Sequence, residues 1–244
     1  MTLCVLSHRS VITIKWENRF SFIQGLITQD IERLETKPIV YSLLLSAQGK
    51  FQYDLFLWDD DGILYIDTDR PSDLVQLLKR YALRRDLDIC ISDLKVYAAI
   101  GDTTPDRDHF QKTPFVFDDP RHNQMGKRLY TNQDLNVTGK LADYDAHRLM
   151  YGVIDGSRDM TIDRSIPLEW NMDQLHAISW DKGCYMGQEL TSRTKHLGLI
   201  KKRIQVFDDQ AFKIAASNPT VKHVKSYGQQ HLCFVRLDED ESNI

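Results

Sequence analysis

Closely spaced cysteines are absent from this sequence. The 244 residues contain four cysteines, which stand singly at Cys4, Cys90, Cys184 and Cys233, and no CxxC pair occurs. A zinc ribbon or a self-contained metal cluster needs several nearby thiolates, so we predict no metal site held by this chain alone. Scattered, unpaired cysteines are typical of a reducing compartment, and a cytoplasmic location is expected.

Long apolar runs and an excess of positive charge are also missing. No apolar run reaches the roughly 18 residues of a membrane span, and Met1–Arg9 lacks the basic and apolar regions of a signal peptide. The net charge is −4, with 42% hydrophobic and 27% charged residues. We therefore expect a soluble globular protein, monomeric, that binds neither membranes nor nucleic acid.

The apolar patterns predict an α+β fold. Apolar runs rich in β-branched and aromatic residues predict strands over Val11–Trp16, Ile39–Ser46, Phe51–Trp58, Ile63–Asp67, Leu87–Ile91 and Leu94–Ile100. The two runs around Gln48-Gly49-Lys50 form a hairpin. Helical spacing and capping residues predict helices over Arg19–Leu26 after Asn18, from Pro71 onward, over Tyr144–Gly152 and over Gln188–Lys195. The proline-containing segment Asp102–Asn123 is expected to be a loop, and strands resume after Ile200.

Residues 182–189, KGCYMGQE, are the most informative stretch for function. They place a thiol, a phenol, an ammonium, an amide and a carboxylate around Gly183 and Gly187. Glycine permits positive φ and close approach of a ligand, and so polar a segment is not expected in a core. We predict a site loop entering a helix near Gly187, where Lys182 and the helix start favour a reactive thiolate at Cys184. The alternative is an ordinary packed thiol. Apolar neighbours predict burial for the other three cysteines, Cys4, Cys90 and Cys233.

The octapeptide resembles the KGCYxGQE signature of the YgfZ family, which are folate-binding proteins related to the glycine-cleavage T protein, an aminomethyltransferase. Weaker similarities follow in order over about residues 8–205, at Phe22–Gly25, Thr28–Asp30, Leu43–Lys50, Asp54, Asp119–Arg121, Gly126, Arg128, Arg148 and Gly152. The resemblance implies a protein that binds tetrahydrofolate or a related reduced folate. It further implies support for the assembly or repair of iron–sulfur clusters, through transient contact with iron–sulfur proteins or cluster carriers.

The resemblance also implies an aminomethyltransferase (GcvT)-like fold with three parts around a central cavity. Residues 1–50 and 120–198 would form a discontinuous folate-binding domain, and residues 51–119 a ferredoxin-like domain. Residues 199–244 would form a small β-barrel-like domain, although they are few for a complete barrel.

A reduced folate needs flat apolar walls, polar partners for the pterin edge and cations for its glutamate tail. The predicted walls are Trp180 and Tyr185. The predicted edge partners are Glu169, Gln188 and Glu189, and the tail partners are Arg148, Arg193 and Lys182. Asp54, which is carried by the resemblance, completes the set. The alternatives are a core position for Trp180 and surface ion pairs for Glu189 and Arg148.

Two other functions compete with a non-classical accessory protein that uses Cys184 and Lys182. A folate-dependent aminomethyltransferase would carry an Asp-Asp pair where this chain has Tyr53-Asp54. A phenol cannot replace a carboxylate at neutral pH, which favours the accessory role. A thiol enzyme with Cys184 as nucleophile and His196 as base is the remaining alternative.

Overall fold

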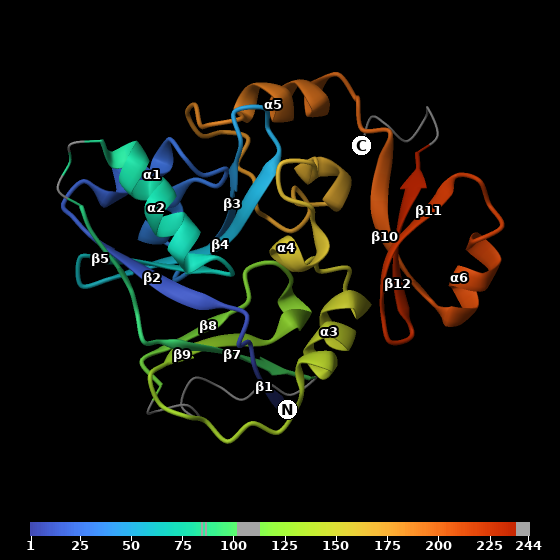
Figure 1. Cartoon of the computed structure of the whole chain (residues 1–244), viewed down its shortest axis with the longest axis horizontal. Helices are drawn as coiled ribbons and strands as arrows, with labels where there is room; N and C mark the ends of the chain where they lie inside the picture. Colours follow the sequence, from blue (N-terminus) through green and yellow to red (C-terminus); the bar gives the residue numbers. More distant parts are fainter. Residues whose placement is uncertain (84, 86, 102–112, 238–244) are drawn as a thin grey trace.

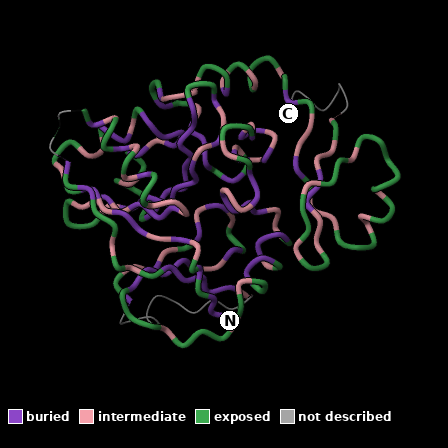
Figure 2. The backbone as a smooth tube through the Cα atoms, viewed as in Figure 1, coloured by how far each residue is buried: buried purple, intermediate pink, exposed green. Residues whose placement is uncertain are grey.

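The computed structural model describes residues 1–83, 85, 87–101 and 113–237. These residues form three sheets with helices packed beside them (Figure 1), in agreement with the α+β prediction. The buried residues gather around the five-stranded and four-stranded sheets, whereas the three-stranded C-terminal sheet is mostly exposed or half-buried (Figure 2).

A five-stranded antiparallel sheet carries the predicted hairpin. Its order is β3 (Val40–Leu45), β4 (Phe51–Asp60), β5 (Ile63–Thr68), β2 (Ser10–Lys15) and β6 (Asp88–Ile91). Strands β3 and β4 are buried on both faces because each face covers a separate core. Leu43 pairs with Asp54 and faces the main core, while Tyr53 faces the second core. The hairpin thus points Tyr53 and Asp54 in opposite directions.

Helix α2 (Pro71–Ala82) covers the second core, as its spacing predicted. Pro71 stands in the first turn, where a missing backbone N–H costs nothing. Leu74, Leu78 and Ala82 are buried against the sheet. Helix α1 (Arg19–Gln24) and the 3₁₀ turn η1 (Ile31–Glu35) lie nearby. The predicted cap of α1 is wrong, because the Asn18 side chain makes no capping hydrogen bond.

A four-stranded sheet has the order β1 (Thr2–Val5), β7 (Lys95–Ile100), β9 (Lys127–Thr131) and β8 (Phe115–Asp118). Strand β8 lies in the segment predicted as a loop, of which residues 102–112 fall outside the described residues. The prolines of this segment favoured the loop prediction, although proline is tolerated at edge strands such as β8. It forms because Phe115 and Phe117 pack on Trp58, with ring centroids 5.5 and 5.6 Å away.

The connecting helices lead to the C-terminal sheet. They are η3 (Asn123–Met125), α3 (Leu141–Met150), α4 (Gly156–Asp159), η4 (Pro167–Trp170) and α5 (Gln188–His196). The last sheet has the order β10 (Lys202–Asp208), β12 (Gln230–Arg236) and β11 (Val221–Tyr227). A helix missed by the sequence reasoning, α6 (Asp209–Ala215), is capped by the Asp208 side chain. The predicted division into domains remains a proposal. Its boundary at residue 50 lies in the turn of the β3–β4 hairpin, so it separates two paired strands of one sheet.

Candidate functional site

Two segments that are far apart in the sequence are tied together by Lys182. Its Nζ donates hydrogen bonds to the carbonyl oxygens of Gln24, Ile27 and Gln29, at 2.7, 2.8 and 2.9 Å. The backbone N–H of Met186 donates to the carbonyl of Gly25 at 3.0 Å. The signature loop is therefore held against the segment that follows α1.

Gly187 fixes the other end of the loop against the β3–β4 turn. Its φ is +80°, and a Cβ there would lie 2.5 Å from the carbonyl oxygen of Ser46 and 3.0 Å from the Cα of Gly49. No side chain larger than hydrogen fits this contact. Both glycines were predicted to provide a positive φ or a close approach, and Gly183 provides neither. No atom lies within 4 Å of a Cβ placed at Gly183, and its φ is not in the left-handed region.

The ammonium of Lys182, which was predicted as a partner for a folate tail, is occupied by these three backbone carbonyls. The residue is 9% exposed, and burial lowers the pKa of Lys182 to about 8. The ammonium also lies 5.3 Å from the ring centroid of Tyr185. Tyr185 is itself buried in the main core, and burial raises the pKa of its hydroxyl to about 12.

Cys184 is exposed on this fixed loop. Cys4 and Cys233 are buried, as their apolar neighbours predicted. Cys90 is exposed, which corrects the prediction that it would be packed away. Its Sγ lies 3.2 Å from a carboxylate oxygen of Asp88, and this hydrogen bond raises the pKa of the Cys90 thiol. Two of the four thiols are therefore accessible, and they have different electrostatic surroundings.

Helix α5 keeps its predicted folate partners on the protein surface. Glu189 and Arg193 form an exposed ion pair of 2.9 Å one helical turn apart. The Oε1 of Gln188 accepts a hydrogen bond from the backbone N–H of Tyr185 at 3.2 Å. These residues stabilise the helix and its entry, and they do not converge with the remaining predicted partners.

Trp180 and Glu169 are also engaged locally. Trp180 is half-buried against the main core, and the Nζ of Lys195 lies 5.0 Å from its ring centroid. Glu169 lies 3.5 Å from the Nζ of Lys202. The sequence proximity of Trp180, Tyr185 and Glu189 therefore does not place them in one cavity.

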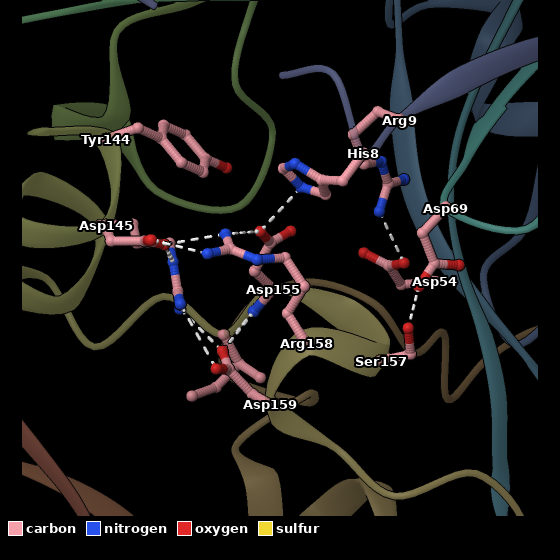
Figure 3. Close-up of polar contacts among 12 residues, drawn as sticks. His8, Arg9, Asp54, Asp69, Tyr144, Asp145, Asp155, Ser157, Arg158 and Asp159 are labelled. Atoms are coloured by element: carbon pink, nitrogen blue, oxygen red, sulfur yellow. Dashed lines mark hydrogen bonds and ion pairs between the residues drawn. The ribbon is translucent and has the colours of Figure 1, made fainter. Parts of the chain in front are cut away.

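Arg148 lies neither at a cavity mouth nor on the surface, because it belongs to a buried ionic network. Asp145, Arg158 and Asp159 of this network are shown in Figure 3. The guanidinium of Arg148 donates to Asp159 at 2.7 Å and to Asp145 at 2.8 Å. Arg158 joins the same network by donating to Asp145 and to Asp155. A buried guanidinium with paired carboxylates holds the chain around α4 in place.

Asp54 lies in the neighbouring part of the network, also drawn in Figure 3. It accepts a hydrogen bond from Arg9 at 2.7 Å and one from the hydroxyl of Tyr41 at 3.3 Å. Burial raises the pKa of Asp54, although Arg9 opposes that shift. Gly156 packs directly on this carboxylate, because a Cβ there would lie 2.3 Å from Oδ1. Tyr53, on the other face, lies beneath the guanidinium of Arg70, 3.9 Å from its ring centroid.

A cavity of about 470 Å³ opens beside Tyr41, and the sequence reasoning missed it. Its lining combines an aromatic ring, carboxylates and cations, namely Gln29, Arg33, Lys37, Pro38, Ile39, Val40, Tyr41, Asp118, Asp119, Pro120 and His176. His176 has a φ of +58°, a strained value of the kind that gathers at ligand sites. The cations of Arg33 and Lys37 just before a buried strand were the signal available in the sequence.

The cavity has the size and the mixed lining of a small-molecule site. Its volume falls within the range of about 300–1,000 Å³ usual for small-molecule sites. Tyr41, Asp118 and Asp119 contribute to its lining. The carboxylate of Asp119 is paired with Arg121, and that of Asp118 lies 2.6 Å from the Nζ of Lys127. Arg33 and Lys37 are exposed at its rim.

In the part of the chain that the structure describes, no group of three or more His, Cys, Asp or Glu side chains could hold a metal ion. The helices described there include none with the length and apolar character of a membrane span.

Comparisons with known proteins identify relatives. No family profile matches the chain. It is 32% identical over 215 residues to the mitochondrial iron–sulfur cluster assembly factor IBA57 homolog of Pyricularia oryzae, covering 82% of this chain and 55% of that protein. It is 30% identical over 229 residues to the mitochondrial IBA57 of Mus musculus, covering 82% and 64%. The chain thus spans less than two thirds of the length of these relatives.

Among solved structures, the chain superposes on glycine cleavage system aminomethyltransferase T from Bartonella henselae. The TM-score is 0.73 at 13% identity, covering 96% of this chain and 78% of that one. The predicted aminomethyltransferase-like fold is confirmed. The predicted cytoplasmic location is wrong, because the relatives are mitochondrial proteins. Unpaired cysteines argue only against an oxidising compartment, so they could not make this distinction.

Proposed function

Because the chain is a homologue of the IBA57 iron–sulfur cluster assembly factors, in keeping with its resemblance to the YgfZ family, we propose that it supports iron–sulfur cluster assembly through Cys184. One observation carries this proposal: Cys184 is an exposed thiol on a loop that Lys182 and Gly187 fix from both sides. A rigid loop presents its side chain to a partner in one defined position.

One thiolate is too few to ligate a cluster within a single chain. Cys184 therefore contributes one ligand, and a cluster carrier or client protein contributes the others. The test is anaerobic addition of ferric iron and sulfide, with glutathione as the second thiolate donor. Visible absorption of a protein-bound cluster should require Cys184 and survive Cys90→Ser, the matched change at the other exposed cysteine. Equal absorption from Cys184→Ser would contradict the proposal.

The cavity beside Tyr41 is the proposed site for tetrahydrofolate. Tyr41 forms the wall for the pterin, Asp118 accepts hydrogen bonds from its amino edge, and Arg33 and Lys37 pair with the glutamate carboxylates. This assignment replaces the set predicted around Trp180 and Glu189, whose members are engaged elsewhere.

Anaerobic calorimetry with tetrahydrofolate tests the site. We expect a micromolar dissociation constant, weakened at least about tenfold when Arg33 and Lys37 are both changed to Glu, since charge pairs of this kind contribute on the order of 1–3 kcal/mol. Arg193→Glu is the control, because Arg193 lies on the outer face of α5. Absence of binding by the unmodified protein would refute the folate proposal.

A folate-dependent aminomethyltransferase stays a second candidate because of Asp54. The argument from Tyr53 weakens, since Tyr53 faces away from the cavity while Asp54 contacts its wall residue Tyr41. Methylene transfer from an aminomethylated lipoyl carrier to tetrahydrofolate distinguishes the candidates. Turnover that Asp54→Asn abolishes would support the transferase, and no turnover supports the accessory role.

A further inference from the structure

Four polar side chains form a continuous series on the C-terminal sheet, remote in sequence from Cys184. The Nε2 of His223 lies 2.9 Å from the Oγ of Ser226. The same Oγ lies 2.8 Å from the Nδ1 of His231, and the Nε2 of His231 lies 2.8 Å from a carboxylate oxygen of Asp209. The series joins β11, β12 and α6.

The partners determine which nitrogen carries each proton. An ionised Asp209 can only accept, so the Nε2 of His231 donates to it and the Nδ1 is left with a lone pair. The hydroxyl of Ser226 therefore donates to this Nδ1. Its oxygen then accepts from the Nε2–H of His223. The result is a serine hydroxyl bonded to a basic nitrogen, with the imidazole oriented by a carboxylate.

Packing holds these groups in place while leaving the serine accessible. Ser226 and His231 are directly paired across β11 and β12. The ring of Phe212 stacks on His231 with a centroid distance of 4.2 Å and an interplanar angle of 19°. The side chain of His231 is 13% exposed, whereas Ser226 and His223 are exposed. The base is thus fixed and the oxygen is open to a substrate.

The next residue of β11 points the other way. The hydroxyl of Tyr227 donates to Asp159 in the buried network at 2.5 Å, and the guanidinium of Arg148 lies 4.7 Å from its ring centroid. Alternation along the strand therefore separates the serine face of the sheet from the face that contacts the rest of the protein.

We propose that Ser226, His231 and Asp209 form a nucleophilic site that cleaves small activated carboxylic esters. The Oγ of Ser226 forms a bond to the carbonyl carbon while its proton passes to the Nδ1 of His231. The bond to the leaving alcohol breaks, and that proton passes to the alcohol. Water then hydrolyses the acyl-serine by the same route, which restores the hydroxyl.

The surrounding residues define the substrate class. The Nε2–H of His223 is donated to the Oγ of Ser226 before reaction, and His223 lies close enough to turn this N–H to the carbonyl oxygen as negative charge develops there. Phe212 lies 5.2 Å from His223 and offers an apolar wall for a short acyl or aryl group. The two ring nitrogens have exchanged places relative to the histidine of a serine protease. In this protein Nδ1 of His231 faces the serine and Nε2 faces the carboxylate. Either nitrogen can accept the proton when a carboxylate holds the other.

A fluorophosphonate probe tests the site, since it forms a phosphorus–oxygen bond with an activated serine and releases fluoride. Peptide mapping by mass spectrometry should place the label on Ser226. Ser226→Ala should abolish labelling, and His231→Gln should slow it by about 100-fold. Ser217→Ala, at another exposed serine of this region, is the matched control and should label at the original rate.

Hydrolysis of p-nitrophenyl acetate gives the second measurement. The same variants should lower its rate in the same order, with unchanged thermal unfolding for Ser226→Ala because that side chain is exposed. Absence of label from Ser226, or labelling that His231→Gln leaves unchanged, would overturn the proposal and show that the series only ties α6 to the sheet. Neither result depends on folate or on Cys184.

Discussion

Gly49 and Gly187 meet backbone to backbone, although 137 residues of sequence separate them. A Cβ on Gly49 would lie 3.0 Å from the carbonyl oxygen of Gly187, and a Cβ on Gly187 would lie equally close to the Cα of Gly49. This contact joins the hairpin turn to the signature loop. It explains physically why both segments carry glycine, since each has a positive φ and no room for a side chain.

Gly187→Ala should destabilise the protein by at least about 2 kcal/mol, because it combines a left-handed backbone with a clash against the carbonyl of Ser46. Gly183→Ala should change the free energy of unfolding by less than about 0.5 kcal/mol, since open space surrounds that position. Urea unfolding of both variants measures the difference. Equal effects would contradict the close packing of Gly187.

Lys182 should make stability depend on pH in the alkaline range. Burial lowers the pKa of Lys182 from 10.5 to about 8 in the folded protein. Between these values the unfolded chain binds more protons than the folded one, so the free energy of unfolding rises with pH. Relative to Lys182→Met, the rise from pH 8 to 10.5 should be roughly 1–3 kcal/mol. A fall across this window would contradict the buried position of the ammonium.

Arg9→Met should cost about 3–5 kcal/mol of stability, because it leaves the buried carboxylates of Asp54 and Asp67 without their shared guanidinium. Arg19→Met removes the ion pair with Asp59, whose side chains are 18% and 22% exposed, and should cost about 1 kcal/mol or less. Thermal and urea unfolding compare the two. Similar losses would show that the buried network contributes no more than the outer pair.

Brief substoichiometric alkylation should label Cys184 faster than Cys90, although both are exposed. The hydrogen bond to Asp88 raises the pKa of Cys90, so less of its reactive thiolate is present at neutral pH. Cys4 and Cys233 should remain unlabelled in the folded protein because they are buried. Mass spectrometry of the peptides gives the order, and faster labelling of Cys90 would contradict it.

Local patterns explain which parts of the fold were predictable. The hairpin and α2 follow from apolar runs separated by Gly49 and from the spacing of Leu74 and Leu78, signals that do not depend on distant contacts. Strand β8 was missed because its stability comes from Trp58, far away in sequence. Its flanking prolines gave the stronger local signal.

The candidate site was predictable only at Cys184. The signature placed that thiol on an exposed loop, but it could not show that Lys182 binds three carbonyls of another segment. Glu189 and Arg193 were predicted to bind different parts of one folate. Their helical spacing instead puts them on one outer face, where they form an ion pair. The cavity combines Tyr41 with His176, a contact that only tertiary folding creates.

Cells that lack their own IBA57-type factor show whether Cys184 acts in iron–sulfur cluster assembly. The activity of an iron–sulfur enzyme is measured after expression of this protein, its Cys184→Ser variant or its Cys90→Ser variant, at equal protein levels. We predict that the unmodified protein and Cys90→Ser restore the activity, whereas Cys184→Ser does not. Restoration by Cys184→Ser as complete as that by the unmodified protein would contradict a role for the Cys184 thiol.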